Sequence, residues 1–120
     1  MSSKYGNRRT TVDGITFASK AEAKRYQELM LELQAGEIRN LKLQPEFHVQ
    51  EGYIDPTTGQ RVKPIKYIAD FSYERHWKQA EGMEGWMRIV EDVKGHETDV
   101  FKLKYQMMIE RFGIWVDIIK

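Results

Sequence analysis

Two apolar, strand-like segments that carry acidic residues constrain most strongly what this chain can fold into. The first spans residues 67–71, with the sequence YIADF, and the second spans residues 90–94, with the sequence VEDVK. Side chains on a strand alternate between its two faces, so Asp92 and Lys94 point the same way, about 7 Å apart. If the two segments form neighbouring antiparallel strands, Asp70 can lie beside Asp92 at one end of the sheet.

Length and composition exclude several classes of protein. The 120 residues are enough for one domain, 1–120, with a core of its own, and the absence of cysteine excludes disulfides and thiolate metal sites. The net charge of +1 argues against binding nucleic acid by bulk electrostatics alone. No apolar run approaches the roughly 18 residues of a membrane span, and the N-terminus has no signal-peptide core. We therefore expect a single cytoplasmic domain that does not associate with membranes.

Turn and capping signals predict an α/β (α+β) fold. The predicted elements are a hairpin around Asp13-Gly14, a helix from Ser19 to about residue 35, strands over 37–50, 65–73 and 86–94, a helix from Thr98 or Asp99 to Gly113, and a strand over 114–119. Residues 51–63 contain the turn sequence DPTTG and are predicted to form a protruding loop or hairpin tip. After the initial hairpin, the order is helix, three strands, helix, strand.

Asp70 and Asp92 form a candidate metal site. Like charges repel, so a fold keeps two adjacent carboxylates together mainly when a cation lies between them. Oxygen donors without sulfur suit Mg²⁺ or Mn²⁺ rather than zinc. We expect Asp70, Asp92 and the Val93 carbonyl to hold the ion, which would polarise a phosphate oxygen and lower the pKa of a bound water.

Lys94 completes this candidate site. We expect it to orient the attacking water or to neutralise charge that builds on the phosphate in the transition state. The alternative is that Asp92 and Lys94 form an ordinary exposed ion pair, which contributes about 0–1 kcal/mol, and that Asp70 is a solvent-facing acid at a strand end.

Glu22 has two interpretations that the sequence leaves open. With Ser19 it matches a capping box, in which Glu22 turns back to the Ser19 amide. It also lies at the head of the apolar stripe of the first helix, which continues through Tyr26 and Leu29, so it can point toward the sheet. In the second case Glu22 joins the acidic site.

Several further residues are weaker candidates. Glu91 points to the face opposite Asp92, so we expect a supporting or structural role, unless a bulge shifts the register. Gln44 could donate a hydrogen bond within the site or could be an edge residue. Lys104 borders the apolar stripe of the second helix and could approach a phosphate.

The basic N-terminal segment is a further candidate for contact with DNA. Residues 1–9 contain Lys4, Arg8 and Arg9 and no acidic residue. Such a segment is expected to be a flexible, solvated tail, and contact with phosphates is the alternative role.

The series Asp70…Asp92-Val93-Lys94 resembles the D…(D/E)-x-K motif of the PD-(D/E)XK nuclease superfamily. Together with the blocks at residues 13–23, 44–45, 67–71 and 90–95, it makes the chain similar to a family of small phage and prophage endonuclease-like proteins. That family has long been catalogued as of unknown function and is related to Holliday-junction resolvases. The resemblance implies a restriction-endonuclease-like core with a mixed sheet, and a metal site that the helix glutamate, here Glu22, joins.

The resemblance implies a Mg²⁺- or Mn²⁺-dependent DNA endonuclease acting on branched phage DNA in the cytoplasm of a bacterial host. Paired cuts in a two-fold junction would need a symmetric homodimer. One alternative is a nicking nuclease that acts with the proteins of phage DNA packaging, replication or recombination. The other is a module of the same fold that binds nucleic acid or protein without catalysis.

Overall fold

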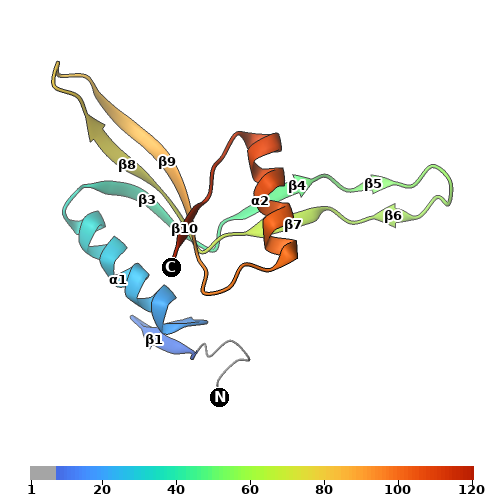
Figure 1. Ribbon diagram of the computed structural model, residues 1–120, viewed down its shortest axis with the longest axis horizontal. Coiled ribbons are helices and arrows are strands. Elements are labelled where there is room, and N and C mark those ends of the chain that lie inside the picture. The colour runs from blue at the N-terminus through green and yellow to red at the C-terminus, as the bar shows by residue number, and fades with distance from the viewer. Residues whose placement is uncertain (1–7) are drawn as a thin grey trace.

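The computed structural model describes residues 8–120, so Lys4 lies outside the described residues. Ten strands and two helices occur in this range (Figure 1). In chain order they are β1 (Thr10–Val12), β2 (Ile15–Phe17), α1 (Lys20–Gln34), β3 (Ile38–Leu43), β4 (Glu46–Gln50), β5 (Tyr53–Ile54), β6 (Arg61–Val62), β7 (Ile65–Ile68), β8 (Phe71–Lys78), β9 (Glu84–Val93), α2 (Asp99–Phe112) and β10 (Asp117–Ile119). The mixed α/β class predicted from the sequence is confirmed.

The main sheet is mixed and has four strands in the order β10-β9-β8-β3. β9 pairs with β8 and β8 with β3 in antiparallel fashion, whereas β10 runs parallel to β9. The final strand is shorter than the predicted 114–119, because pairing with β9 begins only at Asp117. A strand that follows its neighbour through a helix is the usual source of a parallel pair.

Local turn and capping chemistry places the first hairpin and both helices as predicted. Asp13 and Gly14 both have positive φ, 54° and 77°, which is the backbone that a two-residue hairpin loop requires. The Ser19 hydroxyl accepts a hydrogen bond from the Glu22 amide at the start of α1. Thr98 caps α2 in the same way, and Gly113 ends α2 in the left-handed conformation.

Two of the predicted long strands are each broken in the middle, so those predictions were wrong. The strand expected over 37–50 divides into β3 and β4 at Gln44-Pro45, and the strand expected over 65–73 divides into β7 and β8 at Ala69-Asp70. Pro45 has no amide hydrogen, and Gln44 takes a φ of 51° that no regular strand adopts. The two breaks lie opposite each other, joined by the bonds Gln44 N to Asp70 O and Ala69 N to Pro45 O.

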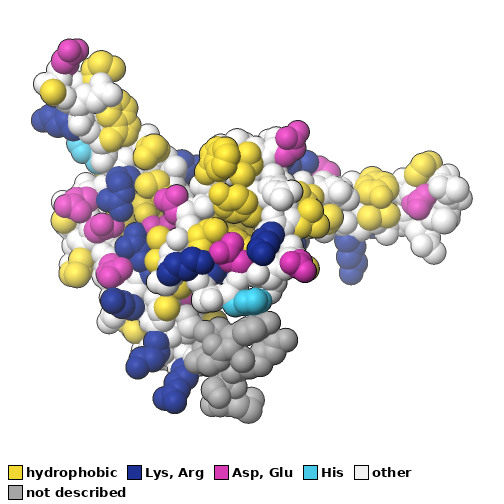
Figure 2. Space-filling view, viewed as in Figure 1, with side chains coloured by type: hydrophobic (Ala, Val, Ile, Leu, Met, Phe, Trp, Pro, Cys, Tyr) yellow, Lys and Arg dark blue, Asp and Glu magenta, His cyan; other side chains and the backbone are white. Residues whose placement is uncertain are grey.

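Two hairpin arms project from the body of the protein (Figure 1). One is the β5–β6 hairpin, which confirms the protruding tip predicted at 51–63. The other is the outer half of β8–β9, whose ladder continues to Lys78 and Glu84, so the predicted strand bounds of 73 and 86 at this end were wrong. Exposed hydrophobic side chains occur on both arms, as Figure 2 shows.

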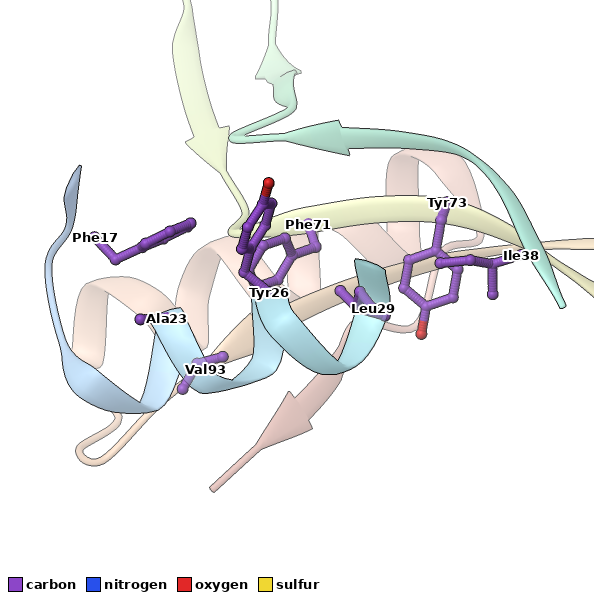
Figure 3. Close-up of a cluster of buried hydrophobic side chains, with 8 residues drawn as sticks. All are labelled: Phe17, Ala23, Tyr26, Leu29, Ile38, Phe71, Tyr73 and Val93. Carbon is purple, nitrogen blue, oxygen red and sulfur yellow. The ribbon is translucent and has the colours of Figure 1, made fainter. Parts of the chain in front are cut away.

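Each helix covers one face of the sheet with its own cluster of buried side chains. On the α1 face, Tyr26 and Leu29 pack against Phe71 and Tyr73 of β8 (Figure 3). On the α2 face, the buried set is Phe47, Val49, Tyr67, Ala69, Val90, Phe101, Met108 and Val116. Neither helix in residues 8–120 has the length and apolar character needed to cross a membrane.

Leu29→Ala tests the α1 face of the core. Leu29 is fully buried, so its truncation is expected to lower the free energy of unfolding by about 2–5 kcal/mol, measured by urea denaturation. Leu31 lies two residues further along the same helix and is 68% exposed, which makes Leu31→Ala the matched control. Equal losses in the two variants would contradict the packing described here.

Candidate active site

The break in the sheet brings Asp70 and Asp92 together. Asp70 lies between β7 and β8, and its amide donates to the Glu91 carbonyl of β9 (3.1 Å). Its carboxyl group interacts with that of Asp92 strongly enough to raise the pKa of Asp70, and the Val93 amide donates to Asp70 Oδ2 (2.7 Å). The two acids predicted to share one end of the sheet therefore lie close together.

Asp92 is buried on the α2 face of the sheet, with only 1% of the residue exposed. The Tyr67 hydroxyl donates to Asp92 Oδ2, and Lys94 Nζ lies 3.5 Å from the same oxygen. The Lys94 ammonium also lies 4.8 Å from the centre of the Phe101 ring, at the start of α2. Asp92 and Lys94 thus share one face, as strand alternation predicted.

The environment of Asp70 favours its protonated form. Burial, followed by the hydrogen bond and the charge repulsion from Asp92, raises the pKa of Asp70 to about 8. The pKa of Tyr67 is also raised, by burial and by its hydrogen bond to Asp92. At neutral pH, Asp70 is accordingly protonated in the absence of a cation.

Glu22 approaches this pair from the first turn of α1. The pKa of Glu22 is raised, mainly because the side chain is partly buried. A hydrogen bond from the Ala18 backbone and the charge of Lys94 lower this pKa, whereas the charge of Asp92 raises it. Only half of the expected capping box forms, since Ser19 accepts from the Glu22 amide but the Glu22 carboxylate bonds at Ala18. The site interpretation of Glu22 fits this position better than the capping one.

A small cavity of about 120 Å³ opens beside the pair. It is lined by Ile15, Thr16, Phe17, Glu22, Leu43, Gln44, Asp70 and Phe71. Gln44 therefore lies at the site, positioned by its left-handed backbone and by the bond from its amide to the Asp70 carbonyl. A positive φ at a non-glycine residue often accompanies a functional constraint.

Glu91 lies on the other face and belongs to a separate buried network. Arg25 Nε donates to Glu91 Oε1 (2.8 Å) and Arg25 Nη2 to Oε2 (2.6 Å), while the Tyr73 hydroxyl donates to Oε2. Hydrogen bonding to Glu91 raises the pKa of Arg25, and burial with the same carboxylate raises that of Tyr73 to about 12. This bidentate ion pair joins α1 to β9, one turn from Glu22 and one residue from Asp92.

The remaining basic candidates are not bonded to the acidic cluster. Arg8 and Arg9 are exposed beside β1, and Lys104 is half-buried on α2. No hydrogen bond or ion pair within residues 8–120 joins any of them to Asp70 or Asp92. The sequence reasoning did not identify Tyr67 and Arg25 as neighbours of the site, because their partners are 25 and 66 residues away in the chain.

The donors at this position are all oxygen atoms. The carboxylates of Asp70, Asp92 and Glu22 and the Val93 carbonyl suit a hard divalent cation such as Mg²⁺. A raised pKa in two neighbouring carboxyl groups is consistent with a site whose charge a cation would balance. Across residues 8–120, however, no three His, Cys, Asp or Glu side chains already form a group that could hold a metal ion.

Comparison with known proteins places the chain in one family. Residues 2–117 match the family described as "Protein of unknown function (DUF1064)", and because this is nearly the whole chain, the protein belongs to that family. Neither the curated proteins nor the solved structures give a match.

Arg25→Ala tests the ion pair that joins α1 to β9. Removing the guanidinium leaves the Glu91 carboxylate buried without its charged partner, so the free energy of unfolding is expected to fall by about 3 kcal/mol in urea denaturation. The adjacent, exposed Lys24 gives the control Lys24→Ala, with an expected change within about 0.5 kcal/mol. Adding Glu91→Gln to Arg25→Ala is expected to recover part of the loss; a loss no larger than that of the control would refute the assignment.

Asp70→Asn tests the protonation of Asp70. The pKa of Asp70 is about 8 in the folded protein and 3.8 ordinarily, so the folded state binds this proton more tightly than the unfolded state. The contribution of Asp70 to the free energy of unfolding is therefore lost as the pH rises from about 4 to about 8. Asparagine can accept from Val93 and donate to Asp92 without a charge, so Asp70→Asn in EDTA is expected to be more stable than wild type at pH 8 by at least about 1 kcal/mol. The advantage is expected to shrink toward pH 4, and the exposed Asp117→Asn serves as control. Parallel pH profiles for wild type and Asp70→Asn would contradict the protonation of Asp70.

Proposed function

We propose that this protein is a divalent-metal-dependent endodeoxyribonuclease that hydrolyses phosphodiester bonds in branched DNA. The observation that carries the proposal is the convergence of Asp70, Asp92, Lys94 and Glu22 from three separate parts of the chain, namely α1, the break between β7 and β8, and the end of β9. Three acids and one ammonium group, two of the acids lining a cavity, are the groups that metal-assisted phosphodiester hydrolysis needs.

The fold supports the same proposal. A restriction-endonuclease-like core has a helix, three strands, a second helix and a final strand around a mixed sheet. The order of α1, the long broken strands, α2 and β10 is compatible with that core, with the acids at the break of the sheet. The match of Asp70…Asp92-Val93-Lys94 to the D…(D/E)-x-K pattern of PD-(D/E)XK nucleases lends further support.

The residues of the site have distinct proposed roles. Asp70, Asp92, Glu22 and the Val93 carbonyl hold Mg²⁺ or Mn²⁺, which when bound supplies Lewis-acid stabilisation of charge on the phosphate. Lys94 then faces the phosphate and neutralises charge that develops on it, while the aromatic ring of Phe101 limits where its ammonium can lie. Tyr67 fixes the orientation of the Asp92 carboxylate by donating to Oδ2.

The proposed substrate and assembly follow from the resemblance to junction resolvases. A four-way junction has two equivalent strands to cut, and a homodimer with two-fold symmetry would present one site to each. The low net charge of +1 is compatible with recognition of DNA shape, in which a few positioned contacts matter more than total charge. The setting that this proposal implies is the cytoplasm of a bacterial host, with phage packaging or recombination proteins as possible partners.

A cleavage panel tests the proposal. A four-way junction, a flap, a nicked duplex, an intact linear duplex and a single strand are each incubated with Mg²⁺ or Mn²⁺, and products are resolved on denaturing gels. We expect the wild-type protein to cut the junction, and Asp92→Asn and Lys94→Ala each to lower the rate by at least about 100-fold while the fold persists in circular dichroism.

The exposed Asp117→Asn and Lys102→Ala are the matched controls and are expected to cut like wild type. Equal cleavage of junction and linear duplex would support nicking without junction preference. Cleavage that survives Asp92→Asn, or no cleavage of any substrate by the wild type, would refute the assignment of this site.

A further inference from the structure

The sheet that carries Asp92 continues outward from the site as three cross-strand rows. Nearest the cavity, Gln44, Asp70 and Asp92 lie across the ends of the strands. The next row follows the register Lys42↔Ser72↔Val90, and the third follows Arg39↔Glu74↔Arg88. Directly opposed residues point to the same face, so both outer rows share the face of Asp92.

A hollow of about 500 Å³ lies over the two outer rows. Its lining residues are Asn40, Lys42, Ser72, Tyr73, Glu74 and Arg88. It is wide and open, unlike the small cavity beside Asp70, and Lys42 in its lining directly precedes Leu43 and Gln44, which line the small cavity.

The hollow contains two cations outside any ion pair of residues 8–120, and the charge of one of them, Arg88, adds to the hydrogen bond from Arg39 in lowering the pKa of the opposed Glu74. Glu74 is engaged by Arg39 Nε (2.8 Å) and by the Asn40 side chain. Neither Lys42 nor Arg88 forms an ion pair within residues 8–120, and the Arg88 guanidinium lies 5.3 Å from the centre of the Phe47 ring. The hollow thus offers an ammonium, a guanidinium and the Ser72 hydroxyl, which are donors suited to phosphate oxygens.

The backbone of β3 is bent where these cations lie. The register with β8 shifts between Arg39 and Lys42, and Asn40 has a φ of 56°. A bulge of this kind re-aims the side chains next to it, and such backbone strain is concentrated at functional sites. Here it leaves Lys42 opposite Ser72, in the row next to Asp70 and Asp92.

We propose that this hollow binds the sugar–phosphate backbone of the DNA strand that is cut, beside the scissile phosphate. The proposal rests on the proposed nuclease function and assigns the path of the substrate. Successive rows on the sheet are separated by about 7 Å, which is comparable with the separation of neighbouring phosphates in a DNA strand. One phosphate contacts Lys42 and Ser72, and the next contacts Arg88, without reading base sequence.

The salt dependence of DNA affinity tests this path. Fluorescence anisotropy measures binding of a labelled junction in EDTA, where no cleavage occurs, between 50 and 200 mM salt. The double variant Lys42→Ala/Arg88→Ala is expected to reduce the slope of log K against log salt by about 2 and to weaken binding at least about tenfold. The control pair Arg61→Ala/Lys63→Ala removes the same charge from the β5–β6 arm and is expected to leave the slope unchanged.

The outcomes separate this proposal from the proposed function. One outcome is that the wild type binds and cuts DNA but Lys42→Ala/Arg88→Ala keeps the wild-type salt slope. Another is that this variant and the control Arg61→Ala/Lys63→Ala change the slope equally. In either case the proposed path of the DNA is wrong and the nuclease assignment stands. If the wild type neither binds nor cuts any DNA, both are wrong. Arg88→Lys retains the charge and is expected to retain the slope, which distinguishes phosphate contact from loss of packing on Phe47.

Discussion

The close approach of the carboxyl groups of Asp70 and Asp92 is the interaction on which the rest of the site depends. Two acids that lie close together in a buried position repel each other unless a proton or a cation lies between them, and the raised pKa of Asp70 reflects this cost. The sheet maintains this approach through backbone bonds on both sides, to Glu91 and from Val93. The proposed cation would balance the charge of this pair beside the cavity that Asp70 lines.

The surrounding elements contribute by aligning parts of the chain that are far apart in sequence. The opposed breaks at Gln44-Pro45 and Ala69-Asp70 end one ladder and begin another, which places Asp70 at the junction of the two. The Arg25–Glu91 ion pair sets the position of α1 on β9, and Glu22 precedes Arg25 by one turn. Local backbone irregularity and one buried ion pair together bring the third acid to the other two.

Much of this architecture could be predicted from the sequence, because its signals are local. The Asp13-Gly14 turn, the caps at Ser19 and Thr98 and the left-handed Gly113 depend on neighbouring residues alone. The breaks in the long strands were missed, since an apolar pattern continues through them and only the pairing of both strands reveals the bend.

Within the site, strand alternation was enough to predict that Asp92 and Lys94 share a face and that Glu91 faces away. The partners Arg25 and Tyr67 could not be predicted, because nothing near them in sequence indicates which strand they meet.

The central claim is best tested by calorimetric titration of Mg²⁺ into the metal-free protein in two buffers of different ionisation enthalpy. The account predicts binding at a single site with release of about one proton per ion at pH 7, lost in Asp92→Asn and kept in Asp117→Asn. Absence of binding, or binding that Asp92→Asn leaves unchanged, would contradict it.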